Sequence, residues 1–309
     1  NGLVLIKHFC KIVQSVIEPT LFVGHCAKGI IAILVWVDDI LVGSSCLSLY
    51  EEFVELYKKR FPSQHEQGCK KFAGLSIDYK PGHSLTIHQR PHIELAYDKF
   101  VTDKALASKS PYVHRPAVSD RNSSLHYSKL NLAASDSERR TMQTVPFLPA
   151  LATLMYTVHF TQCHLNYHTS FLGQFMHDPS PLCMDAVIGL IIYAYHHRDV
   201  DVIIYGGPLS VPRVIPQKRR QDFQDSFGFH SYADASWLLR SPAGYVVMFY
   251  NGPVDWASKL IRVICHSTAE AEIAAGCMLG KRVVFILQFA AEFKLDLKAP
   301  AMLLIDNTA

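Results

Sequence analysis

The sequence predicts an α/β protein built from more than one compact unit, and three observations lead to this prediction. The chain has 309 residues, a length that suits two or three units. Apolar runs of strand length recur in its first and last hundred residues, and segments with helical periodicity fill the middle. Hydrophobic residues make up 49% and charged residues 18%, so buried cores are expected and an intrinsically disordered chain is excluded.

The first unit centres on the segment LVWVDDILVGS. An almost wholly apolar run from Ile30 to Val37 and a second one from Ile40 predict two buried strands, with Asp38 and Asp39 at the turn between them. A plain hairpin turn is one interpretation, because Asp is common in turns. A cation site is the other, since adjacent carboxylates repel each other and Asn-Gly or Asp-Gly would make a better turn.

After the hairpin, residues 48–61 predict an amphipathic helix in which Ser48 and Glu51 have capping-box spacing. The basic residues at its C-terminal end suit either the helix dipole or a nucleic-acid patch. Two strands joined by a turn and a helix that begins with proline are expected next, at 72–79, 84–88 and 91–101.

The middle of the chain predicts helices. Residues 102–145 are polar and Ser-rich and predict a long exposed connection. Three helices and then a short strand are expected at 147–159, 165–177, 181–197 and 201–205. The proline-rich loop that follows is the expected domain boundary. Its run Lys218-Arg219-Arg220 is either a solvated linker or a phosphate contact.

From residue 228 the pattern changes to short strands, expected at 229–235, 243–250, 253–258 and 261–265. Asn251-Gly252 predicts a two-residue hairpin between the second and third of these. Helical stretches at 268–280 and 281–294 and a strand at 301–306 complete a mixed α/β sandwich.

Three carboxylates of this last unit have notable positions. Asp234 ends a strand, Glu272 lies on a helix, and Asp306 ends the final strand. Glu270 is two residues from Glu272 and therefore faces another way, so only one of them can point at the sheet. Carboxylates at strand ends suit divalent cations, and two Mg²⁺ ions could activate a water for attack on a phosphodiester. The alternative is that each acid is a cap or an exposed group.

Other classes of protein are disfavoured. The eight cysteines include no CxxC pair, which favours thiols in a reducing compartment over a disulfide framework, and Cys163-His164 lacks zinc-ligand spacing. No signal peptide opens the sequence, and its apolar runs are expected to be too short for a membrane span.

Taken in order from about residue 12, the motifs resemble the Pol polyprotein of copia-type LTR retrotransposons. VWVDDILVG is similar to the family's YVDDILI, FAGLSI to FLGIEI, YADASW to YSDADWA, STAEAEIAA to SSxEAEYxA, and LLIDNTA to IYCDNxxA. Each match is weak by itself, but the ordered series is specific.

The resemblance implies a partial reverse-transcriptase palm over 1–90, a thumb/connection-like helical region over 91–207 and a C-terminally truncated ribonuclease H-like domain over 208–309. By position, two of the three polymerase aspartates and three of the four ribonuclease H carboxylates would be Asp38, Asp39, Asp234, Glu272 and Asp306. These residues would bind Mg²⁺, or Mn²⁺ in its place. The implied partners are RNA template, DNA primer, RNA–DNA hybrid, dNTPs and the rest of the polyprotein, with no membrane. The implied location is the cytoplasm, inside a virus-like particle, or the nucleus.

The chain also departs from the family pattern. The remaining polymerase aspartate is expected upstream of residue 1 and the fourth ribonuclease H carboxylate beyond residue 309. Family residues are replaced at six positions: Trp36, Gln162, His164, Cys183, Gly189 and Ser236. Two alternatives to an active enzyme therefore stand: an inactive remnant that at most binds nucleic acid, and a weak stand-alone metal-dependent nuclease.

Overall fold

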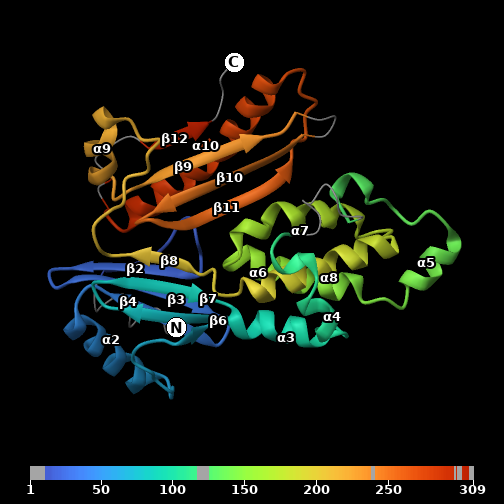
Figure 1. Ribbon diagram of the computed structural model, residues 1–309. Coiled ribbons are helices and arrows are strands. Elements are labelled where there is room, and N and C mark those ends of the chain that lie inside the picture. The colour runs from blue at the N-terminus through green and yellow to red at the C-terminus, as the bar shows by residue number, and fades with distance from the viewer. Residues whose placement is uncertain (1–10, 117–124, 238–240, 296, 298–300, 306–309) are drawn as a thin grey trace.

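A computed structural model describes residues 11–116, 125–237, 241–295, 297 and 301–305. It is a mixed α/β protein, as predicted, and the described residues form three four-stranded sheets. Figure 1 shows the C-terminal sheet above the two N-terminal ones, with a lobe of helices to one side.

The first sheet is antiparallel, with strand order β1-β2-β3-β4 and bounds Lys11–Gln14, Leu21–Cys26, Gly29–Trp36 and Asp39–Ser44. Helix α2, Leu47–Arg60, packs Leu49 and Phe53 against the strand residues Ile31 and Ile33. The predicted capping box is wrong, because the helix begins after Cys46 and Ser48 lies inside it. Ser-x-x-Glu spacing alone does not place a helix start.

The second sheet joins distant parts of the chain. Its order is β5-β6-β7-β8, with bounds Lys71–Phe72, Leu75–Lys80, Ser84–His88 and Val202–Tyr205. The strand predicted at 72–79 is interrupted by a turn at Ala73 and Gly74, where φ is +48° and +79°. The Tyr156 hydroxyl donates to the Ala73 carbonyl at 2.9 Å and holds this turn against the helical lobe.

The helical lobe lies between β7 and β8 in sequence. Its longer helices are α3, α6 and α8, at Arg90–Phe100, Phe147–Phe160 and Pro181–His196. Short helices and 3₁₀ turns add α4, η1, η3, α5, η4, α7 and η5, at Lys104–Ser108, Pro111–Val113, Tyr127–Lys129, Asp136–Met142, Cys163–Leu165, Asn166–Leu172 and Gly173–Phe175. The predicted exposed connection at 102–145 is only partly correct, since Leu125, Leu130 and Met142 are buried in the core of the lobe. Cys183 and Gly189 are buried there too.

The third sheet has order β11-β10-β9-β12, and β12 runs parallel to β9 whereas the other pairs are antiparallel. The strands are His230–Ala235, Pro242–Phe249, Gly252–Leu260 and Met302–Ile305, preceded by η6 at Gln217–Arg219 and α9 at Arg220–Asp225. The predicted strand at 261–265 is wrong, because this segment is irregular.

The hairpin between β10 and β11 differs from the prediction by one residue. Phe249 pairs with Gly252, so the two loop residues are Tyr250 and Asn251, with φ of +46° and +62°. A Cβ on Gly252 would lie 2.3 Å from the carbonyl oxygen of Ile203 in β8. Glycine is therefore required here by the close approach of the second sheet.

Helix α10, Thr268–Glu292, is continuous where two helical stretches were expected. Ala275, Leu279 and Val283 pack on the third sheet, and Arg282 Nε donates to Asp255 Oδ2 at 2.6 Å. Contrary to the expectation from sequence, α10 is long and apolar enough to cross a membrane, judged by length and composition only.

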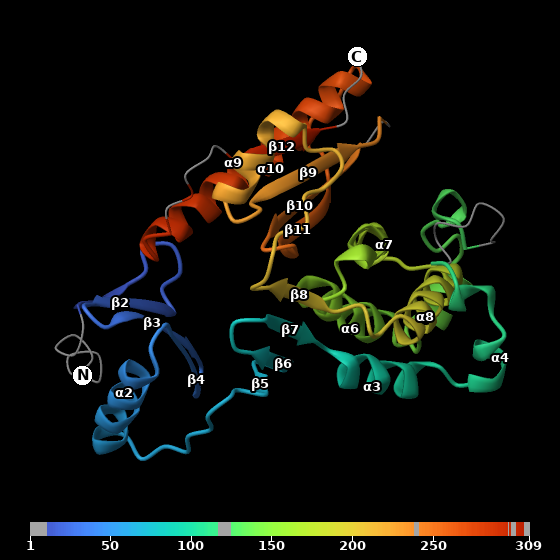
Figure 2. The same cartoon turned by 60° about the vertical axis from the view of Figure 1, so that its left-hand side comes forward.

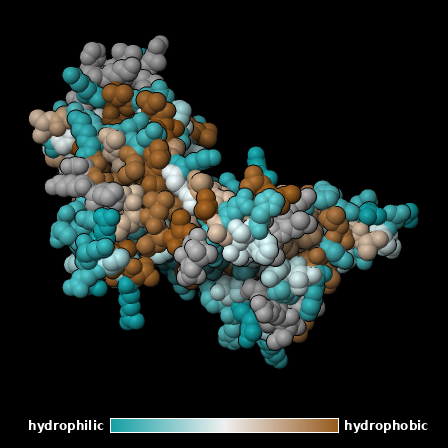
Figure 3. Space-filling view, turned by 90° about the horizontal axis from the view of Figure 1, so that it is seen from above, coloured by the Kyte–Doolittle hydropathy of each residue, from teal (hydrophilic) through white to brown (hydrophobic). Residues whose placement is uncertain are grey.

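The third sheet and α10 carry a band of apolar surface on the face seen from above (Figure 3). Exposed side chains of α10 include Ile273 and Val284, at 61% and 54% of their full exposure. The apolar composition of α10 is thus shared between a face that packs on the sheet and a face that meets solvent.

The parts of the chain contact one another through specific hydrogen bonds. Trp256 Nε1 of β11 donates to the Val158 carbonyl of α6 at 2.9 Å. At the other end of the molecule, the Val16 amide donates to Glu292 Oε1 at 2.9 Å. Figure 2 shows this end of α10 reaching the first sheet.

Candidate functional site

The β3–β4 hairpin carries the first predicted pair of carboxylates. Trp36 pairs with Asp39 across the hairpin, so Val37 and Asp38 form the loop and Asp39 begins β4. Both carboxylates are exposed, as the prediction of a strand–turn–strand apex requires. Val37 has φ of +52° and is 86% exposed. A β-branched residue in the left-handed region is a genuine outlier, so this tip stores strain.

Among the described residues, few titratable groups surround the carboxylates of the hairpin. One of them is the Cys69 thiol, whose pKa is raised by burial and then by the nearby charges of Glu66 and Asp39. Within the described parts of the chain, no group of three or more His, Cys, Asp or Glu side chains is arranged to hold a metal ion. Asp38 and Asp39 therefore gain no third ligand from these residues.

Asp234 lies near the end of β9 and is exposed on the sheet face opposite α10. Alternation along β9 turns Ala233 towards α10 and Asp234 away from it. Across the sheet, Asp234 pairs with Gly244, and Gly244 pairs with Ser258. The position beside the carboxylate thus has no side chain.

Glu272 comes to the same strand end from the other side. It lies in the first turns of α10, is only 8% exposed, and its Oε1 accepts the Ala235 amide at 3.3 Å. The structure thus brings Glu272 into contact with Ala235, the residue that follows Asp234.

Glu270 has a different role, as its spacing from Glu272 predicts. Its amide donates to Ser267 Oγ at 3.1 Å, and its Oε2 accepts the His266 amide at 2.6 Å. This is a capping box at the start of α10.

The last predicted carboxylate, Asp306, lies outside the described residues. The strand before it, β12, pairs in parallel with β9, and its final residue Ile305 is opposite Ala233. Parallel strands end at the same edge of a sheet, so β12 is directed to the edge where Asp234 and Glu272 lie.

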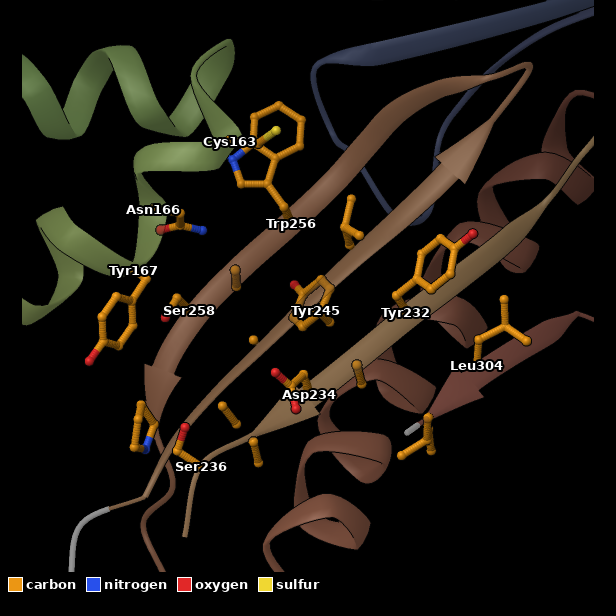
Figure 4. A pocket seen from close by; sticks show the side chains of 18 of the residues that line it. Cys163, Asn166, Tyr167, Tyr232, Asp234, Ser236, Tyr245, Trp256, Ser258 and Leu304 are labelled. Atoms are coloured by element: carbon orange, nitrogen blue, oxygen red, sulfur yellow. The ribbon is translucent and has the colours of Figure 1, made fainter. Parts of the chain in front are cut away.

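A groove of about 1170 Å³ lies in front of Asp234 (Figure 4). Its floor is the open face of the third sheet, with Tyr232, Val246, Trp256 and Leu304 in one cross-strand row beside Asp234. Its second wall comes from η4 and α7 of the helical lobe and includes Asn166 and Tyr167. The groove is therefore built from segments far apart in sequence.

Sequence reasoning missed this second wall. The sequence marks Cys163-His164 only as a pair without zinc-ligand spacing and His164 as a replaced family position, and no signal marks Asn166 or Tyr167. Burial and the nearby His197 lower the pKa of His164 to about 4, so this wall is uncharged at neutral pH. Gln162, at a family arginine position, donates from Nε2 to the Val200 carbonyl at 2.8 Å and has a structural contact.

Comparison with known proteins finds similarity to retroelement polyproteins, as the motif series predicted. The chain is a relative of the retrovirus-related Pol polyproteins of transposons. It is 24% identical over 302 residues to the one from transposon RE1 of Arabidopsis thaliana, which covers 96% of this chain. It is 23% identical over 277 residues, or 88% of the chain, to the one from transposon TNT 1-94 of Nicotiana tabacum.

The match covers only part of these relatives, since the chain spans 18% of the RE1 polyprotein and 19% of the TNT 1-94 polyprotein. A shorter relative is the putative transposon Ty5-1 protein of Saccharomyces cerevisiae, 21% identical over 82% of this chain and 74% of its own length. No family model matches the chain, and no solved structure matches it.

Proposed function

We propose that the chain is the part of a copia-type Pol polyprotein that holds a partial reverse-transcriptase palm, a connection-like helical lobe and a ribonuclease H-like domain. Its activity is metal-dependent cleavage of the RNA strand of an RNA–DNA hybrid, centred on Asp234. The hairpin at Asp38 and Asp39 belongs to a polymerase site that needs a further carboxylate.

One observation carries this proposal. The sheet order β11-β10-β9-β12, with α10 on one face, directs Asp234, Glu272 and the strand before Asp306 to a single edge. Carboxylates that are 34 and 38 residues apart in sequence can converge only through such a fold. The groove in front of Asp234 gives a substrate access to that edge.

The oxygen ligands present suit Mg²⁺ or Mn²⁺. Asp234, exposed on the groove face, and Glu272, which accepts the amide of the next residue in β9, offer hard carboxylate oxygens at the same strand end, and Mg²⁺ needs few protein ligands because it keeps several waters. When bound, the metal would lower the pKa of a water and neutralise charge on the phosphate. The Ala235 amide orients Glu272, and the Asp234 carboxylate faces the groove where a phosphodiester would lie.

Cleavage of a labelled RNA–DNA hybrid with Mg²⁺ or Mn²⁺ tests the proposal. Asp234→Asn and Glu272→Gln should each abolish or strongly reduce cleavage. Glu270→Gln is the matched control, two residues away on the same helix, and it keeps the capping box because Gln also serves there. Cleavage that persists in Asp234→Asn, or that is lost equally in Glu270→Gln, would contradict the assignment.

A second candidate, an inactive remnant that binds nucleic acid, is favoured by one observation. The described residues, which do not include Asp306, contain no group of three His, Cys, Asp or Glu side chains arranged to hold a metal. This candidate predicts hybrid binding without cleavage under either metal, so the same assay separates the two.

A further inference from the structure

The second wall of the groove is fixed in place by the helical lobe. Ser170 of α7 donates from Oγ to the Ser258 carbonyl at 2.8 Å, and Trp256 donates to the Val158 carbonyl. These bonds hold Asn166 and Tyr167 across the groove from Asp234, on the far side of β11 (Figure 4). The lobe therefore contributes side chains to a site whose carboxylate belongs to the third sheet.

At Gly244, between Asp234 and Ser258 in the cross-strand row, no side chain covers the floor of the groove. A Cβ built on Gly244 would meet only the Ala257 carbonyl oxygen, at 3.5 Å, which is an ordinary contact. Packing therefore does not require glycine here. What glycine supplies is open space beside the Asp234 carboxylate, where a ligand backbone could come close.

The chemistry of the lining points to one kind of ligand surface. Among the described residues that line the groove, none is Lys or Arg, and Asp234 is the one carboxylate. The amide of Asn166 and the phenol ring of Tyr167 are neutral groups that hydrogen-bond and stack. A phosphate backbone is normally bound by cations, whereas sugar hydroxyls and base faces are bound by groups like these.

We propose that Asn166 and Tyr167 contact the sugar and base edges of the RNA strand bound at Asp234. The absence of a side chain at Gly244 leaves the space in which this strand approaches the carboxylate. The choice of ligand rests on the proposed function. Asn166 and Tyr167 are positioning residues, and their contribution is independent of salt because it involves no phosphate.

Equilibrium binding of a fluorescent RNA–DNA hybrid to the full chain tests the proposal. Asp234→Asn is the common background, so that cleavage does not interfere, and a DNA duplex of the same sequence is the comparison ligand. Each variant is measured from about 50 to 200 mM salt, the range over which phosphate contacts weaken strongly.

We expect Tyr167→Ala, Asn166→Ala and Gly244→Val to weaken hybrid binding by about tenfold, in line with the loss of one base contact. Binding of the DNA duplex should weaken less. Plots of log affinity against log salt should stay parallel to the background. A variant that lost a phosphate contact would instead reduce the slope by about one.

Two matched controls test for indirect effects. Tyr205→Ala changes an exposed tyrosine of β8, and Gly43→Val changes a strand glycine with open space around it, both outside the groove. Neither should alter affinity. Gly244→Ala, with its ordinary contact, should fold and show a smaller loss than valine, and thermal unfolding by circular dichroism verifies the folding of each variant.

Unchanged hybrid affinity in the groove variants, equal losses for hybrid and DNA duplex, altered salt slopes, or no hybrid binding by the chain would each overturn the inference. The proposed function is judged separately, by cleavage in the wild-type chain and its loss in Asp234→Asn. Cleavage with unchanged affinity in Tyr167→Ala would leave the function standing and remove the inference. Hybrid binding that the groove variants weaken, without cleavage by the wild-type chain, would keep the inference and remove the proposed function.

Discussion

The two carboxylate sites of this protein differ in what supports them. Asp38 and Asp39 lie at the exposed tip of one hairpin, and the described residues bring no third ligand to them. Asp234 lies where two parallel strands and the start of a long helix meet, faces a two-walled groove, and is followed in sequence by Ala235, whose amide donates to the buried Glu272. The Asp234 site is therefore assembled from several elements, whereas the Asp38 and Asp39 pair is carried by the tip of one hairpin.

The largest expected difference is in catalysis. Asp234→Asn should reduce hybrid cleavage by on the order of 10²–10³, the typical cost of removing one electrostatic stabiliser. Asp38→Asn should leave cleavage unchanged. Primer extension should give no dNTP incorporation with either metal, because two carboxylates on one hairpin cannot complete a two-metal site. Incorporation that Asp38→Asn abolishes would reverse the comparison.

Acid should weaken the groove side of the molecule through His168 of α7. Burial, and then the charge of His164, lowers the pKa of His168 from 6.5 to about 4. As the pH falls, His168 is protonated in the unfolded chain before it is protonated in the folded one. The contribution of the neutral, buried His168 to the free energy of unfolding is therefore complete above pH 6.5. It is lost as the pH falls towards 4, by at most about 3 kcal/mol.

Urea unfolding followed by circular dichroism across this range measures the effect. His168→Gln should reduce the pH dependence and leave the part that His164 contributes, whereas His65→Gln, at an exposed histidine beside α2, should keep it whole. The same pH dependence in both variants would show that His168 is not its cause.

Strain at the hairpin tip predicts a stabilising substitution. Val37→Gly should raise the free energy of unfolding by about 1 kcal/mol, because glycine adopts the left-handed conformation without cost. Val246→Gly, in the extended strand β10 of the other site, should lower it by about 1 kcal/mol. Chemical denaturation gives both values, and a loss of stability in Val37→Gly would mean that the tip is not strained.

The smallest effect concerns the two Ser-x-x-Glu segments. Glu270→Ala should cost about 0.5–1 kcal/mol, since Glu270 closes the capping box of α10. Glu51→Ala should cost almost nothing, because the structure places Ser48 inside α2 and not at its cap. Equal costs in thermal unfolding would contradict this distinction.

Local patterns predicted much of the fold. Continuous apolar runs located β3 and β4, and the proline at position 91 located the start of α3 within one residue. Errors arose where tertiary contacts decide. The chain turns at Ala73 because Tyr156 holds its carbonyl, and α10 runs through Gly280 because Leu279 and Val283 on either side pack on the sheet.

The candidate site was predictable only in part. Asp234 and Glu272 could be selected because each has a distinctive place on a strand or helix. Asn166 and Tyr167 could not, because their position across from Asp234 depends on contacts such as that of Ser170 with Ser258, 88 residues away. Periodicity has no information on such distances.

The hydrogen bond from Val16 to Glu292 has a consequence for the order of folding during synthesis. It closes a loop of 276 residues, and His25 adds a second contact to the Glu292 carbonyl at 2.9 Å. Contacts of such separation form late, because loop closure must precede any gain from them. During synthesis, the part of the first sheet around Val16 and His25 therefore stays uncovered until Glu292, at the end of α10, has been made.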